Sequence, residues 1–132
     1  MTYAKSQNLS LLILRLIIAA IFIAAGYGKY PMWSSNPYNL GSFDLNLTRF
    51  LSIAEPLGAL ALILGMFTRL AATCLAIVMA GAIYYCLVVY KLGFFPAGSP
   101  GWSFPLCIMG GCIILATFGA GGLSVDASRG KK

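Results

Sequence analysis

The chain has 132 residues, of which 60% are hydrophobic and only 9% are charged, with a formal net charge of +6. A typical soluble domain carries roughly 25% charged residues, so the composition excludes an ordinary soluble domain and predicts an all-α, polytopic membrane protein. The basic residues form no stripe with interleaved aromatics, and we expect no nucleic-acid partner. The chain contains no histidine, which excludes a His-ligated haem within this chain and leads us to expect no metal site.

Four apolar segments follow one another along the chain, at about residues 9–27, 50–67, 70–90 and 103–123. Each approaches the ~20 residues that a helix needs to cross the hydrocarbon core of a bilayer. The link between the second and third segments is only about two residues long, which makes these helices antiparallel neighbours. The sequence therefore predicts a four-transmembrane-helix antiparallel bundle, with residues 1–132 forming a single domain. Residues 1–25 resemble a signal peptide, but Arg15 interrupts their apolar run, so we interpret them as a retained first helix.

The longest link between the segments is an outer loop at 28–49, and Pro56 is expected in the first turns of the following helix. Aromatic residues of the two outer links should lie at headgroup depth, where they either anchor the chain or cap a cavity. Both termini and the short link share one side of the membrane. That side carries five basic residues against three on the other, which predicts cytoplasmic termini. The five are Lys5, Arg69, Arg129, Lys131 and Lys132, and the three are Lys29, Arg49 and Lys91.

Two charges lie inside apolar segments, Arg15 in the first and Glu55 in the second. A charge at the centre of a bilayer costs ~3 kcal/mol, so such residues usually face the bundle interior and have a partner. The chain has only three acidic residues, so the possible partners of Arg15 and Glu55 are few. The predicted topology places each possible partner on one side of the membrane. Arg15 is expected to pair with Asp126 on the cytoplasmic side. Glu55 is expected to pair with Lys29 or Arg49 on the outer side.

Helical spacing places these charges on one face of each helix. The stripe on the first helix comprises Arg15, Ala19, Phe22, Gly26 and Lys29, and the stripe on the second comprises Glu55, Ala59, Leu62, Met66 and Arg69. Small residues between the charges permit close approach of membrane helices. Two interpretations stay open for both charged groups. The charges either lock helices together, or, at Glu55, form a polar site that carries protons or binds a ligand.

The four cysteines form no C-x-x-C pair, so no thioredoxin-like motif is present. Cys86 and Cys107 are expected at similar depth near the outer ends of the third and fourth helices. They could form a disulfide in an oxidising compartment, although free cysteines are the commoner state inside membranes. Cys74 and Cys112 are interpreted as small apolar residues.

Several short segments together resemble the DoxX family of small four-helix membrane proteins. They are Leu14-Arg15-Leu16, Gly26-Tyr27-Gly28-Lys29, Glu55-Pro56-Leu57-Gly58, Gly65-Met66-Phe67-Thr68-Arg69 and the stretch from Gly119 to Asp126. The resemblance implies a four-helix bundle in a prokaryotic inner membrane. It also implies kinship with a subunit of a thiosulfate:quinone oxidoreductase, with membrane partners of thiol-redox enzymes, and more distantly with cargo receptors and assembly chaperones.

Three functional hypotheses follow. The first is a membrane subunit of a quinone-linked or thiol-linked redox assembly, which anchors partner proteins and contributes to a quinone site through Glu55, Lys29 and Arg49. Electrons would then come from another chain, since this one has no cofactor motif, and at most it is a subunit of an oxidoreductase. The second is a non-catalytic structural subunit, scaffold or assembly factor. The third is a small transporter, which would have to form a homo-oligomer.

Overall fold

The computed structural model describes residues 4–130, and this part of the chain is entirely helical. The α-helices are α1 (Lys5–Tyr27), α2 (Ser42–Leu64), α3 (Thr68–Tyr84), α4 (Ser103–Phe118) and the short α5 (Val125–Arg129). A 3₁₀-helix, η1 (Tyr30–Trp33), follows α1, and a π-helical turn, η2 (Tyr85–Val89), extends α3. No strand occurs between residues 4 and 130, and the predicted all-α fold class is confirmed.

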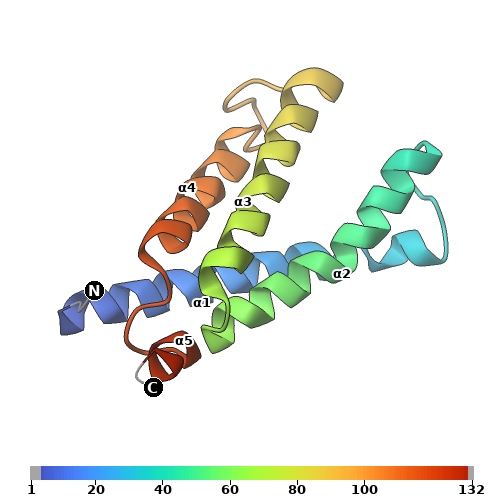
Figure 1. Cartoon of the computed structure of the whole chain (residues 1–132). Helices are drawn as coiled ribbons and strands as arrows, with labels where there is room; N and C mark the ends of the chain where they lie inside the picture. Colours follow the sequence, from blue (N-terminus) through green and yellow to red (C-terminus); the bar gives the residue numbers. More distant parts are fainter. Residues whose placement is uncertain (1–3, 131–132) are drawn as a thin grey trace.

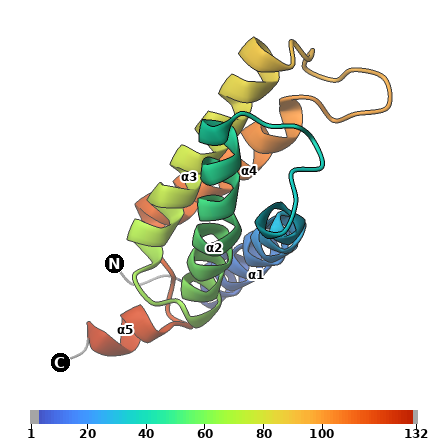
Figure 2. The same cartoon turned by 90° about the vertical axis from the view of Figure 1, so that its right-hand side faces the viewer.

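The helices form two antiparallel pairs, α1 with α2 and α3 with α4 (Figure 1). The pairs meet at the end of the molecule where both termini lie, and they diverge from there. We call this the termini end, and α5 lies across it. The opposite end, where the α1–α2 and α3–α4 connections lie, is called the loop end, and Figure 2 shows both connections there. The charged residues can therefore be assigned to one end or the other.

Three of the described helices are long and apolar enough to cross a membrane. They are α1 with η1, α2, and α3 with η2. The fourth apolar helix, α4, has 16 residues and is about 24 Å long at 1.5 Å per residue, somewhat shorter than the ~30 Å hydrocarbon core. Large apolar side chains such as Ile17, Leu57 and Ile77 are exposed on the outer faces. This surface suits lipid rather than water.

The core follows the predicted stripe on the first helix, and the one on the second helix as far as Leu62. Met66 and Arg69 lie beyond the end of α2 at Leu64, and Arg69 is exposed on α3. On α1 it contains Arg15, Ala19, Phe22 and Gly26, together with Leu11 and Ile18. On α2 it contains Glu55, Ala59 and Leu62, together with Ser52. Ala19 and Ala59 are completely buried, and small residues of this kind permit close approach of membrane helices. Residues of α3 and α4, such as Leu75 and Leu115, complete the core at the junction of the pairs.

Two helix boundaries differ most from the sequence prediction. Helix α2 begins at Ser42, eight residues before the expected start at Phe50. Asp44 lies in its first turn, where a carboxylate interacts favourably with the positive end of the helix dipole. Helix α4 ends at Phe118 rather than Leu123, since Gly119 and Gly121 adopt φ values of +81° and +76° that take the chain out of the helix. The outer loop is therefore shorter than 28–49, and a separate loop connects α4 to α5.

Candidate functional site

Glu55 and Lys29 form a buried ion pair between α2 and α1 near the loop end. Lys29 Nζ donates to Glu55 Oε2 at 2.6 Å and to the Ala25 carbonyl at 3.1 Å. Glu55 is only 2% exposed, so its charge depends on the lysine for compensation. Lys29 keeps about a quarter of its side chain accessible. The structure thus selects Lys29 from the two candidate partners of Glu55.

The pair retains unused hydrogen-bonding capacity. An ammonium group has three N–H donors, and Lys29 uses two of them. Glu55 Oε1 accepts no hydrogen bond from residues 4–130, yet it is not among the fully buried unsatisfied atoms. One acceptor on Glu55 and one donor on Lys29 are therefore left unused at the pair, and they are available to a small polar group.

Close contact between Gly26 and Pro56 holds this ion pair in place. A Cβ atom on Gly26 would lie 2.6 Å from Pro56 Cδ and even nearer to Cγ, and 3.3 Å from the Ser52 carbonyl oxygen. Pro56 lies in the middle of α2 rather than in its first turns, because the helix starts early. A proline there has no N–H for the Ser52 carbonyl, four residues earlier. Gly26 fits against this irregular part of α2, one turn from Lys29.

Arg49 lies at the same end but does not contact Glu55. Its Nε donates to the Met32 carbonyl at 2.8 Å, and its guanidinium lies 5.9 Å from the centre of the Trp33 ring. Trp33 in turn donates from Nε1 to Ser52 Oγ at 2.9 Å. Arg49 therefore connects η1 with α2. The prediction that Arg49 shares one polar site with Glu55 and Lys29 is corrected.

Arg15 occupies the centre of the termini end and is 1% exposed. Its Nε donates to the Leu62 carbonyl at 2.8 Å and Nη2 to the Ile63 carbonyl at 3.0 Å, at the end of α2. Its Nη1 donates to the Ala120 and Leu123 carbonyls, both at 2.9 Å, in the loop after α4. The guanidinium thus binds backbone carbonyls at a helix end, where acceptors lack helical partners, and in a loop. The Leu62 carbonyl also accepts from the Gly65 N–H at 3.2 Å.

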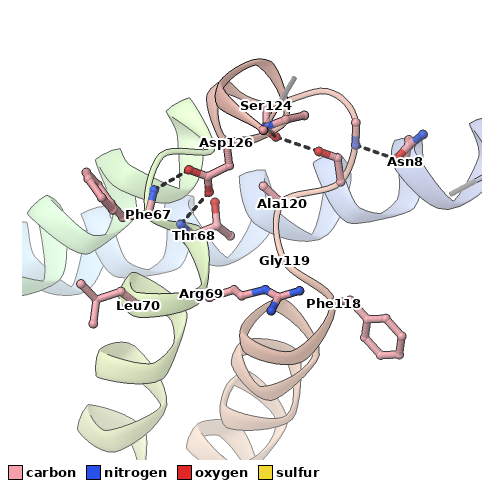
Figure 3. A pocket seen from close by; sticks show the side chains of 14 residues that line it. Asn8, Phe67, Thr68, Arg69, Leu70, Phe118, Gly119, Ala120, Ser124 and Asp126 are labelled. Atoms are coloured by element: carbon pink, nitrogen blue, oxygen red, sulfur yellow. Dashed lines mark hydrogen bonds between the residues drawn. The ribbon is translucent and has the colours of Figure 1, made fainter. Parts of the chain in front are cut away.

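Asp126 is close to this junction but forms no salt bridge with Arg15. Figure 3 shows its carboxylate beside Phe67 and Thr68. Its Oδ1 and Oδ2 accept from the backbone N–H groups of Phe67 and Thr68, each at 2.9 Å. Its own N–H donates to the Gly65 carbonyl at 2.9 Å. The expected Arg15–Asp126 pair is therefore corrected. Both residues lie at the same junction, as their predicted depth in the membrane indicates. Each binds backbone atoms, however, and Asp126 caps the start of α3.

A model of the DoxX family matches residues 10–90 of the chain. The chain belongs to the DoxX family. No curated protein and no solved structure matches it. Together with the apolar helices, the match establishes a multi-pass membrane protein. The matched part includes the ion pair of Glu55 and Lys29 and also Arg15, whereas Asp126 and the loop after α4 lie beyond it.

The DoxX helices are also connected at the loop end by Tyr85 and Asp44. The Tyr85 hydroxyl donates a short hydrogen bond to Asp44 Oδ1 and so connects α2 with the π-helical turn η2. The sequence alone indicates no role for Tyr85 or Asp44. A π-helical turn has no simple sequence signature, and the early start of α2 was not expected. With this bond, every acidic residue of the chain has a defined partner.

The possible disulfide of this DoxX protein is not formed. All four cysteines are free. Cys86 is half-buried within η2, whereas Cys107 is exposed on the outer face of α4. Cys112 is buried in the core, in keeping with a small apolar residue, while Cys74 is exposed.

Replacing Asp126 with alanine should lower the stability of the DoxX fold by about 1–2 kcal/mol, the usual cost of removing a helix cap. The change leaves the N–H groups of Phe67 and Thr68 without acceptors. Thermal unfolding of the detergent-solubilised protein measures the effect. Ser128→Ala is the control, because the Ser128 hydroxyl bonds only within α5. Equal melting of Asp126→Ala and Ser128→Ala would contradict the capping role.

Proposed function

We propose that this DoxX protein is the membrane subunit of a quinone-linked or thiol-linked redox assembly. It would anchor partner subunits and contribute part of a quinone site. The observation that carries the proposal is the buried Lys29–Glu55 pair, which has an unused acceptor at Glu55 Oε1 and an unused donor on Lys29. Family membership supports the membrane role. We further propose a prokaryotic inner membrane with the termini end in the cytoplasm.

The residues present fit a quinone headgroup. A quinone has carbonyl oxygens that accept hydrogen bonds, and its reduction takes up protons as well as electrons. The free N–H of Lys29 can donate to such a carbonyl, while Glu55 Oε1 can hold a proton beside it. Exposed apolar side chains on the neighbouring turns, such as Ile23 and Ile53, suit an isoprenoid tail. A bound quinone would accept the electrons, which a partner subunit would deliver.

A second candidate function is a structural subunit or assembly factor without redox chemistry. The observation in its favour is that the same ion pair joins α1 to α2 beside the tight contact of Gly26 with Pro56. In this case the charges stabilise the helix pair and nothing more. The two functions predict different behaviour of the same variants.

Replacing Glu55 with glutamine tests the proposal. We expect the variant to co-purify with its partners at the native level, since an amide oxygen still accepts from Lys29. Quinone-linked turnover in membranes should fall by about 100-fold, the typical contribution of a positioned acid or base. Asp44→Asn is the matched control, because it also removes a carboxylate near the loop end but leaves the ion pair intact. Its turnover should stay close to the native rate.

A charge-swapped chain separates the two functions further. The double variant Lys29→Glu with Glu55→Lys re-forms the ion pair but moves the carboxylate to α1. If the pair is only structural, assembly and turnover should both recover. If Glu55 handles protons, assembly should recover and turnover should not. Loss of partners in Glu55→Gln, with rescue of every function by the swap, would reject the redox role and favour the scaffold.

A further inference from the structure

A cleft at the termini end lies apart from the Lys29–Glu55 pair. It has a volume of about 820 Å³ and lies between the start of α3, the end of α4 and the loop that leads to α5 (Figure 3). Its lining combines polar groups with the apolar side chains of Phe67, Leu70 and Phe118. The cleft is therefore amphipathic, and it opens where the spanning helices α2 and α3 turn back.

The Thr68 hydroxyl is the first indication of a ligand. Thr68 lines the cleft and is completely buried, and its Oγ1 is the one buried side-chain polar atom among the described residues that has no hydrogen-bond partner. A buried hydroxyl without a partner is unfavourable, because it has lost its hydrogen bonds to water and gained none. Such groups are rare in folded proteins and call for a bound partner or another explanation.

Arg69, the next residue of α3, supplies a positive charge to the same cleft. In Figure 3 its side chain extends across to the end of α4 beside Gly119. A Cβ atom on Gly119 would lie 3.3 Å from Arg69 Nε, so the glycine leaves room for the arginine. Arg69 is exposed, and its guanidinium donates to no group among residues 4–130. Its donors therefore remain available to an oxyanion.

The electrostatics of the cleft favour an anion. The backbone N–H groups of Arg69 and Leu70, in the first turn of α3, have no acceptor among the described residues. The carboxylate of Asp126 also faces this region, but the N–H groups of Phe67 and Thr68 occupy both of its oxygens. Arg129 lies nearby, with its guanidinium 5.6 Å from the centre of the Phe67 ring. Positive groups thus outnumber the single negative one.

We propose that this cleft binds the phosphate group of an anionic phospholipid. Arg69 offers a planar fork of N–H donors that matches phosphate oxygens, and the Thr68 hydroxyl gains the partner it lacks. Phe67, Leu70 and Phe118, which are 59%, 65% and 49% exposed, provide an apolar border for the acyl chains. A free phosphate ion has the same headgroup chemistry but makes no use of this border. The proposal does not depend on the redox role.

Lipid titration followed by native mass spectrometry tests the site on the full chain in mild detergent. The probes are phosphatidylglycerol, diacylglycerol without a phosphate, and inorganic phosphate. We expect phosphatidylglycerol to bind at least tenfold more tightly than diacylglycerol. Arg69→Gln should weaken phosphatidylglycerol binding about tenfold, the loss of one charge-assisted contact. Lys5→Gln is the matched control, because it removes one positive charge at the same end outside the cleft, and it should change binding less than twofold.

Thr68→Val provides a readout independent of charge. Valine has the shape of threonine without the hydroxyl, so the lipid-free variant should melt no lower than the native protein. Its affinity for phosphatidylglycerol should nevertheless fall severalfold. Equal effects of Arg69→Gln and Lys5→Gln, or unchanged binding by Thr68→Val, would overturn the proposal. Displacement of the lipid by millimolar inorganic phosphate, lost in Arg69→Gln, would support a phosphate site but identify a free ion as its ligand.

Discussion

Replacing Arg15 with methionine is expected to destabilise the protein by about 4 kcal/mol, because each buried acceptor that loses its hydrogen bond costs about 1–3 kcal/mol. The change removes the donor of the Ile63, Ala120 and Leu123 carbonyls. It also removes one of the two donors of the Leu62 carbonyl. A loss of this size is a large part of the 5–15 kcal/mol that stabilises a typical domain. Size-exclusion chromatography after stepwise heating in detergent should show that little of the variant remains monodisperse.

Two further substitutions define what Arg15 contributes. Arg15→Lys keeps the charge, but three ammonium donors on a flexible stem cannot reproduce a planar guanidinium that reaches four carbonyls, so an intermediate stability is expected. Arg129→Met removes an arginine whose contact is with the Phe67 ring, and it should cost no more than about 1 kcal/mol. Similar melting of Arg15→Met and Arg129→Met would contradict a central role for the Arg15 network.

Replacing Gly26 with alanine should both destabilise the protein and damage the Lys29–Glu55 pair. The new Cβ would lie 2.6 Å from Pro56 Cδ, and a proline ring cannot rotate away. Helix α1 must then move from α2, at an expected cost of about 1–3 kcal/mol. Lys29, one turn further on, would lose its 2.6 Å contact with Glu55. Thermal unfolding and quinone-linked turnover should both decline.

Gly28 provides the matched control for this experiment. It lies two residues beyond Gly26 and has a helical φ of −62°. The nearest atoms to an added Cβ are carbonyl oxygens at 3.5 and 3.7 Å, which is ordinary contact. Gly28→Ala should therefore leave both stability and turnover nearly unchanged. If Gly26→Ala and Gly28→Ala behave alike, close approach of α1 to α2 is not what positions the pair.

The sequence was sufficient to predict the parts of this fold that depend on side-chain hydrophobicity and periodicity. Apolar segments predicted the all-α class, and a spacing of 3.6 residues placed Arg15 and Glu55 on buried faces. The predicted positions of Lys29 and Glu55, both near the outer ends of their helices, indicated that the two residues could form a pair. These features follow from residue type and position alone, because lipid and core both select for the same apolar pattern.

Contacts with the backbone were beyond sequence reasoning. Arg15 binds four carbonyl oxygens, and any residue can supply a carbonyl, so nothing in the sequence identified them. Because backbone acceptors cannot be identified from the sequence, the partner predicted for Arg15 was Asp126, the acidic residue expected at the same end. The bond between Tyr85 and Asp44 required the early start of α2 and the π-helical turn. The orphan hydroxyl of Thr68 likewise becomes visible only in three dimensions.

The Arg15 network also constrains how the chain is made. Proteins emerge from the ribosome with the N-terminus first, and the Leu123 carbonyl is synthesised 108 residues after Arg15. Helix α1 thus enters the membrane with a cation whose last acceptors do not yet exist. Until α4 and the following loop have emerged, the arginine must stay near the lipid headgroups or be shielded by the insertion machinery. The loop after α4 is therefore what completes the burial of a charge on α1.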